Sequence, residues 1–222
     1  MAASVQMSDT RPSKRPKVRS RAPRRRWALL ILLIPLLVFA YSWWTYPSDR
    51  TPEGAYLRVV SAVNRGAAAA FFAYTEEAAQ HACFSIRDYR KQTLLVAEEH
   101  YPTEELAVLK ERYAPFAAAK DGADVFALMV EREGWLAQLR RDVSGVKAVE
   151  EEGPRASVIT SKGTRYAFRK RPNGIWGMTA FTPTLVDEKE RAARDLEQVE
   201  KAAKDFARVA SESKDTPPGA AP

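Results

Sequence analysis

The sequence predicts an α+β domain that follows a single transmembrane helix and ends in a charged helix. Three observations favour this fold class. Twenty consecutive residues near the N-terminus carry no charge, apolar residues recur at helical spacing between residues 51 and 139, and short alternating runs separated by turn residues occupy residues 146–182. We expect the helices to pack on a small antiparallel sheet, because such a sheet is marginally stable by itself.

Residues 27–46, WALLILLIPLLVFAYSWWTY, form the predicted transmembrane helix. About 20 apolar residues at helical rise span the hydrocarbon core of a bilayer. Aromatic residues stand at both ends of the segment, as they do at membrane interfaces. A cleaved signal peptide is the main alternative, but it needs small residues where Trp43, Trp44 and Tyr46 stand. We therefore expect an uncleaved signal anchor.

The charge distribution predicts the orientation of this anchor. Residues 1–26 hold nine basic residues and a single acidic one, so the positive-inside rule predicts a cytoplasmic N-terminus. We expect this segment to be disordered, with Arg24, Arg25 and Arg26 next to the lipid headgroups of the bilayer. The remainder would then be the extracytoplasmic (periplasmic) part of a single-pass inner (cytoplasmic) membrane protein. It holds 26 basic and 27 acidic residues, which does not indicate nucleic acid as a partner.

The first half of the extracytoplasmic domain, which we place at residues 47–186, is predicted to be helical. Thr51-Pro52-Glu53 has the residues of a helix start, and Gly66 is suited to the left-handed position that ends a helix. Thr75 is expected to cap the longest of these helices, and Gly134 to weaken the last one. The expected helices span residues 51–65, 67–74, 75–100, 103–115 and 125–139.

The second half of the domain is predicted to be an antiparallel meander. Turn residues occur at Gly153-Pro154, at Ser161-Lys162-Gly163 and at Pro172-Asn173-Gly174. Between them the apolar residues alternate, so that Tyr166 and Phe168 share one face of their strand. The expected strands span residues 146–151, 155–160, 164–170 and 175–182.

Residues 187–213 form the predicted charged helix, followed by a disordered tail at 214–222. Apolar residues recur three and four apart along a narrow stripe of this helix, typical of a helix that packs on a single neighbour. Leu196, Val199 and Phe206 in this stripe are candidates for docking to a partner or to a second copy of the chain. The favoured interpretation of the stripe is that the helix packs back on its own domain.

Three short motifs resemble those of the nuclear-transport-factor-two-like superfamily of cone-shaped α+β domains, in particular its extracytoplasmic members of unknown function. They are Thr51-Pro52-Glu53, the Gly66–Ala70 step and Gly174-Ile175-Trp176. The resemblance covers residues 51–182 and implies helices followed by a β-meander. It implies no single function, because this superfamily includes enzymes, binders and scaffolds.

The sequence predicts no catalytic residue, no metal site and no cofactor. His81 and His100 lie nineteen residues apart in one predicted helix, which is too far for a shared metal ion, and Cys83 is the single cysteine. Asp88 and Tyr89 could supply an acid and a phenol to an isomerase, but their spacing does not single them out. The run Glu150-Glu151-Glu152 is typical of a solvated strand end.

Three functions remain open from the sequence. We expect a non-enzymatic binding or scaffold domain for a protein partner in the cell envelope, or for self-association. The first alternative is a small-molecule or lipid binder whose apolar cone is lined by Tyr166, Phe168, Trp176 and Met178. The second, less favoured alternative is an isomerase-like enzyme.

Overall fold

The computed structural model describes residue 35 and residues 47–215. The chain divides into two units, residues 1–46 and 47–222, and the elements below belong to the second. Residues 47–215 form seven α-helices, a short 3-10 helix and a four-stranded antiparallel sheet, so the α+β prediction is confirmed. The predicted N-terminal tail and anchor lie outside the described residues, Pro35 excepted, and so does the predicted C-terminal tail from residue 216 on; residues 214 and 215, expected in that tail, belong to the last helix. Among the described residues, no helix is both long and apolar enough to cross a bilayer.

The first helix of the domain, α2 (Pro52–Arg65), begins and ends as its sequence predicts. The Thr51 side chain accepts a hydrogen bond from the Gly54 amide, and Pro52 fills the first helical position, where its missing N–H is not needed. Gly66 ends the helix with a φ of 71°, a conformation that glycine adopts without strain. The alanine-rich stretch that follows forms α3 (Ala68–Phe71) and the 3-10 helix η1 (Phe72–Tyr74).

The prediction that Thr75 caps the next helix was wrong. The helix α4 (Glu77–His100) begins after Glu76, and no side chain caps it. Thr75 instead lies in a parallel bridge to Met178, and the Glu76 amide donates to the Met178 carbonyl oxygen. Pairing with the sheet thus takes precedence over local capping. This short extended segment covers the outer edge of the last strand.

One predicted helix is divided in two. Residues 125–139 were expected to form one helix weakened by Gly134, whereas the structure has α6 (Gly122–Arg132) and α7 (Trp135–Asp142). Gly134 has a φ of 67°, which interrupts the helical hydrogen bonds and redirects the chain. Asp121 caps α6 by accepting hydrogen bonds from the amides of residues 123 and 124.

The sheet is the predicted meander, with strand order β1-β2-β3-β4, but its last strand, expected over residues 175–182, spans only residues 176–178. Its register pairs Val158 with Tyr166 and Phe168 with Met178, and these four side chains are buried against the helices. The alternate residues Ser157 and Ala167, which also pair, belong to the opposite face. Aromatic rings extend the core; Phe126 packs edge-on against Phe71 and Phe181. The strands span β1 (Val146–Glu152), β2 (Arg155–Thr160), β3 (Arg165–Lys170) and β4 (Trp176–Met178).

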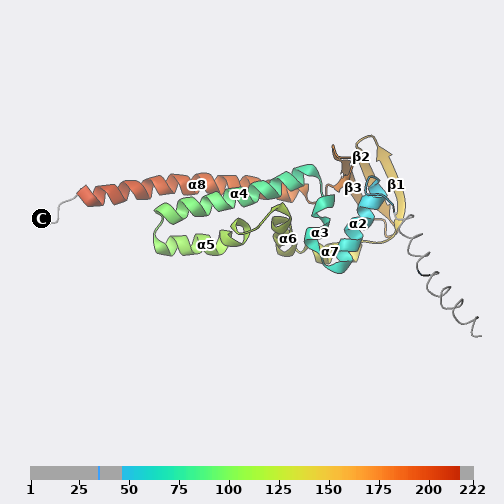
Figure 1. Ribbon diagram of the computed structural model, residues 1–222, viewed down its shortest axis with the longest axis horizontal. Coiled ribbons are helices and arrows are strands. Elements are labelled where there is room, and N and C mark those ends of the chain that lie inside the picture. Colours follow the sequence, from blue (N-terminus) through green and yellow to red (C-terminus); the bar gives the residue numbers. More distant parts are fainter. Residues whose placement is uncertain (1–34, 36–46, 216–222) are drawn as a thin grey trace, which may run out of the picture. The chain divides into compact units, whose positions relative to one another are not determined.

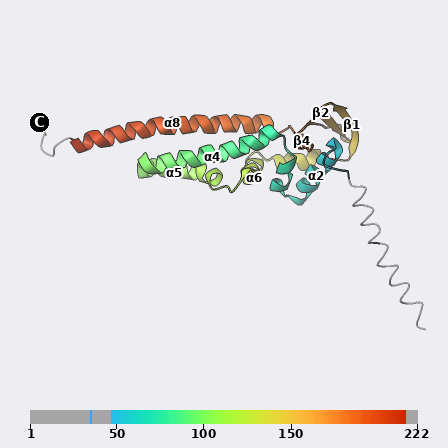
Figure 2. The same cartoon turned by 45° about the horizontal axis from the view of Figure 1, so that its top comes forward.

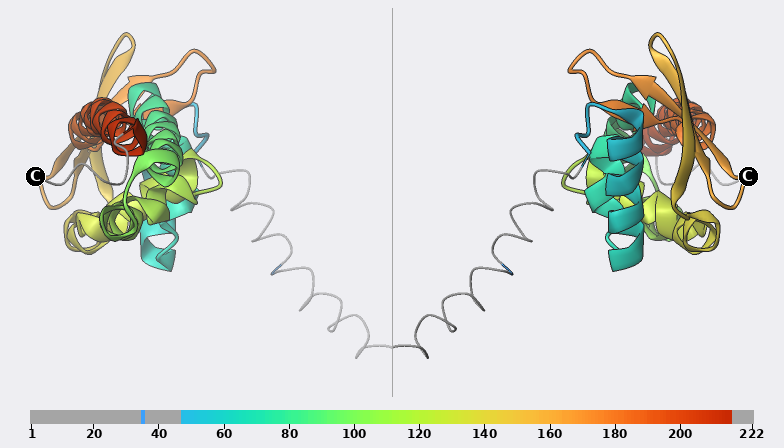
Figure 3. Two further views of the ribbon diagram at one scale, coloured as in Figure 1. Left: turned by 90° about the vertical axis from the view of Figure 1, so that its left-hand side faces the viewer. Right: turned by 90° about the vertical axis from the view of Figure 1, so that its right-hand side faces the viewer.

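Three helices run side by side away from the sheet (Figures 1 and 2). They are α4, α5 (Thr103–Ala117) and α8 (Thr182–Asp215), and we call them the arm. The helix α8 starts five residues before the expected position and lies parallel to α4, from Glu76 and Thr182 at the base to the rings of Tyr101 and Phe206. Figure 3 views the domain along the arm, with α8 in red beside α4.

Replacing Gly177 with alanine should destabilise the fold. A Cβ at this position would lie 2.4 Å from the Thr75 carbonyl oxygen, so β4 and the segment before α4 would have to separate. Overpacking of this kind costs about 1–3 kcal/mol, measured as the free energy of unfolding of the full chain in mild detergent by urea titration. Gly145→Ala is the control, because its Cβ would meet its nearest neighbour at 3.5 Å. Equal stability of the two variants would contradict the packing described here.

Candidate protein-binding surface

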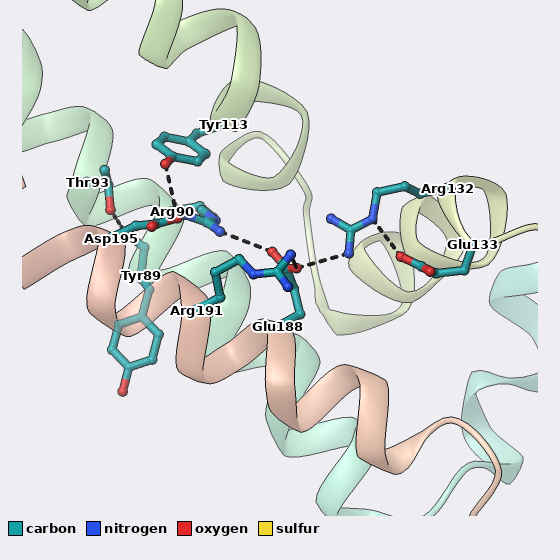
Figure 4. Close-up of polar contacts among 9 residues, drawn as sticks. All are labelled: Tyr89, Arg90, Thr93, Tyr113, Arg132, Glu133, Glu188, Arg191 and Asp195. Atoms are coloured by element: carbon teal, nitrogen blue, oxygen red, sulfur yellow. Dashed lines mark hydrogen bonds and ion pairs between the residues drawn. The ribbon is translucent and has the colours of Figure 1, made fainter.

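A polar cluster lies near the middle of α4, and its members Arg90, Tyr113 and Glu188 are buried (Figure 4). Arg90 of α4 donates to Glu188 at 3.0 Å and also to Asp195, both on α8. Arg132 of α6 donates to the second oxygen of Glu188 at 3.0 Å. The Tyr113 hydroxyl of α5 donates to Asp195 at 3.0 Å. These five residues, which we call the Arg90 cluster, join four helices.

The charges of the Arg90 cluster are matched within the cluster. The Arg90 guanidinium lies 4.2 Å from the centre of the Tyr113 ring, which adds a cation–π contact. Burial and the hydrogen bond to Asp195 raise the pKa of Tyr113, so its hydroxyl stays protonated and donates. Burial would lower the pKa of Arg132, but its bonds to Glu188 and Glu133 raise it. With its charged groups bonded to one another, the cluster is suited to hold helices together rather than to exchange protons with a substrate.

The residues considered for catalysis lie apart. Asp88 pairs with its neighbour Arg87 at 2.8 Å and is half exposed. His81 lies 3.6 Å from Glu77, one turn away in its own helix. Burial raises the pKa of Cys83 to about 12, which keeps its thiol protonated and unreactive. Within the described residues, no group of three or more His, Cys, Asp or Glu side chains could hold a metal ion.

The four candidates for an apolar ligand site are part of the core. Phe168, Trp176 and Met178 are at most 1% exposed, and the Trp176 indole donates to the Arg50 carbonyl oxygen at 3.0 Å. Tyr166 packs on Tyr56 with ring centres 5.5 Å apart, and its buried hydroxyl has no hydrogen-bond partner. Burial raises the pKa of Tyr166 to about 12. The structure thus brings these four side chains together, and they fill the core between the sheet and the helices.

The candidates for partner docking are covered by the chain itself. Leu196 and Val199 are buried, and α4 is the helix that α8 packs against along most of its length. The Phe206 ring lies 4.9 Å from the Tyr101 ring near the end of α4. The helix α8 therefore uses this stripe to pack on its own domain. The remaining candidates, Arg24, Arg25 and Arg26, lie outside the described residues.

An open groove of about 760 Å³ lies on the face of the sheet opposite the core. We call it the sheet groove. Its floor is made of small side chains from three neighbouring segments: Ser157, Ala167 and Thr179. Both sides of the floor carry arginine and glutamate residues. The alternation in the sequence indicates which face of the sheet is exposed to solvent. It does not show that Glu76 and Thr182 line the groove, because they do so only where the first residues of α4 and α8 reach the sheet.

Ion pairs form the two sides of the sheet groove. Arg165 pairs with Glu150 across the strands, and both are more than half exposed. Arg169 pairs at 2.6 Å with the buried carboxylate of Glu76, which also accepts a hydrogen bond from Thr182. The groove therefore offers a floor of small residues between charged sides, which also include Glu152 and Arg155. Such a surface can accept side chains of either charge sign from a protein segment.

Replacing Arg90 with methionine should strongly destabilise the domain. The substitution leaves the carboxylates of Glu188 and Asp195 short of their buried partner, which typically costs about 3–5 kcal/mol. Arg165→Met is the control, since it removes an exposed pair and should cost less than about 1 kcal/mol. Urea unfolding followed by far-UV circular dichroism measures both. A loss below about 1 kcal/mol for Arg90→Met would contradict the role assigned to the cluster.

Tyr166→Phe should leave the domain equally stable or stabilise it by about 1 kcal/mol, because a buried hydroxyl without a partner is unfavourable. The neighbouring Tyr56→Phe should have the opposite sign. The Tyr56 hydroxyl donates to the Ser144 carbonyl oxygen at 2.8 Å and accepts from the Ser144 amide at 3.1 Å. Thermal unfolding of the two variants side by side tests the difference. A lower melting temperature for Tyr166→Phe than for Tyr56→Phe would contradict it.

Comparison with known proteins identifies no family for this chain, since no family model, no curated protein and no solved structure matches it. The resemblance to the nuclear-transport-factor-two-like superfamily therefore stays a prediction.

Proposed function

We propose that residues 47–215 form a non-enzymatic scaffold domain that binds a protein partner through the sheet groove. Residues 27–46 would anchor the domain to the cytoplasmic membrane, and the basic residues before them would keep the N-terminus in the cytoplasm. The domain would then face a partner in the cell envelope. This proposal needs no cofactor.

The observation that carries the proposal is the form of the sheet groove. The groove is open along the sheet. The side chains of its floor, Ser157, Ala167 and Thr179, are all small, and the charged residues lie at the sides. Sites for small molecules are usually enclosed and mostly apolar, with a few polar groups pointing at the ligand. A shallow floor between polar sides is typical instead of contact with a protein segment, with a polar rim around the contact.

The chemistry of the groove favours binding over catalysis. General acid–base chemistry needs a titratable group within hydrogen-bond reach of the substrate and a partner that orients it. In the sheet groove the carboxylates of Glu76 and Glu150 are bonded to Arg169 and Arg165. These groups are held as ion pairs, which suits a docking surface. An isomerase-like activity has no comparable support.

Ala167→Trp tests this proposal by filling the floor of the sheet groove. The exposed position tolerates the larger side chain, so the fold should persist while the partner is displaced. We expect the full chain, extracted gently from its own membranes, to lose its co-purifying polypeptide in native mass spectrometry. Val108→Trp is the matched control, because Val108 is an exposed residue of α5 in the arm.

Two results would count against the proposed function. A partner retained equally by Ala167→Trp and by the unaltered chain would exclude the sheet groove as the binding surface. A partner lost equally in Val108→Trp would assign the effect to general damage or to the arm. Circular dichroism of each variant distinguishes displacement from unfolding.

A further inference from the structure

The strand β1 has an open edge in the described part of the chain. Its outer side has no backbone hydrogen bond from any described segment, whereas the other edge of the sheet, β4, is covered by Thr75 and Glu76. From Lys147 to Glu152 every residue of β1 is exposed. Figure 1 shows β1 at the outer side of the sheet, with β2 as its one neighbouring strand. An unpaired strand edge is a template for a further strand.

The side chains of β1 are arranged for one particular partner, namely β1 itself. In an antiparallel pair centred on Val149, Lys147 lies opposite Glu151 of the other copy, and the reverse pair forms by symmetry. Ala148 then lies opposite Glu150, and Val149 opposite its own copy. Val149 is one of the few large apolar side chains exposed among the described residues, at 37%. Opposite charges directly across two strands stabilise the pair, and apolar contacts add to it.

The three glutamates restrict the register of this pairing. If the centre of the antiparallel pair is moved toward the carboxyl end of β1, glutamate lies opposite glutamate. A parallel pair in register also sets glutamate opposite glutamate, at three positions. A shift the other way shortens the ladder and takes Lys147 away from Glu151. The irregularity in the β1–β2 register lies between Val146 and Ala148 and therefore falls on Lys147, whereas residues 148–152 keep regular strand geometry. Charge repulsion of this kind selects one alignment among several.

We propose that two copies of this chain associate through antiparallel pairing of their β1 strands about a two-fold axis at Val149. The two four-stranded sheets then form one continuous sheet, and the same surface of each copy meets its equivalent, as two-fold symmetry requires. This interface goes beyond the proposed scaffold function, because it is formed by a strand edge and not by the floor of the sheet groove. A dimer would present two such grooves on one continuous sheet.

Cysteine cross-linking tests the predicted register. Directly opposed residues of an antiparallel pair have Cα atoms about 4.5–5.5 Å apart, within the range that a disulfide bridges. We therefore expect the full chain carrying Val149→Cys to form a disulfide-linked dimer in native membranes under mild oxidation. Val108→Cys is the control at an exposed apolar position of α5 and should form no disulfide-linked dimer. The native Cys83 is buried and does not compete.

A charge exchange identifies the partner. Lys147→Glu or Glu151→Lys alone sets like charges opposite each other and should weaken dimerisation by roughly tenfold. The double variant restores opposite charges and should restore the dimer. Sedimentation of the full chain in detergent measures each, with Glu111→Lys on α5 as the control for the change in net charge.

Each outcome decides the proposal. Cross-linking of Val149→Cys no faster than that of Val108→Cys, or a double variant that fails to recover the dimer, overturns it. If a basic peptide were the natural occupant, its binding would be weakened by Glu151→Lys and strengthened by Lys147→Glu. Weakening by Glu151→Lys alone would therefore also overturn self-pairing. Loss of the groove partner in Ala167→Trp is independent of these results, so the two proposals can fail separately.

Discussion

The fold depends on one buried guanidinium. Arg90 is 2% exposed and lies between Glu188 and Asp195, two carboxylates that α8 presents seven residues apart. A buried charge is costly unless it is paired and hydrogen-bonded, so this arrangement requires α8 to occupy one position along α4. Arg132 and Tyr113 then attach α6 and α5 to the same carboxylates. Apolar packing alone along the alanine-rich stripe of α8 would fix that position far less tightly.

The position of α8 decides which face of the sheet stays open. Its first turn brings Thr182 to Glu76, and Glu76 in turn pairs with Arg169 of β3. The arm is thereby joined to one end of the sheet and leaves the floor of the sheet groove uncovered. The same construction leaves β1 without a neighbour on its outer side among the described residues. The two surfaces proposed for binding are thus consequences of where the helices attach.

Local patterns were sufficient for most elements and insufficient for their arrangement. The start and end of α2 and the meander of four strands follow from capping residues, turn residues and alternation, and the structure confirms them. The role of Thr75 was missed because a contact distant in sequence, its bridge to Met178, decides it. At Gly134 a weakened helix was expected, whereas the left-handed conformation of this residue divides the helix in two. The Arg90 cluster was also missed, although Glu188 and Asp195 interrupt the apolar stripe of α8 and could have indicated a buried charged partner. The sheet groove combines residues that are distant in the sequence, from Glu76 to Thr182, and no local pattern predicts that they lie together.

The most direct test of this construction is native-state hydrogen exchange of the full chain. If the Arg90 cluster holds the helices together and the contacts of Glu76 with Thr182 and Arg169 join them to the sheet, amides of α4 and of residues 182–206 in α8 should open with the same free energy as those of β2 and β3, as one cooperative unit. Exchange of α8 by a separate opening, with the sheet still fully protected, would show that the arm is only loosely attached. That result would contradict the central role of the cluster and the fixed boundary of the sheet groove.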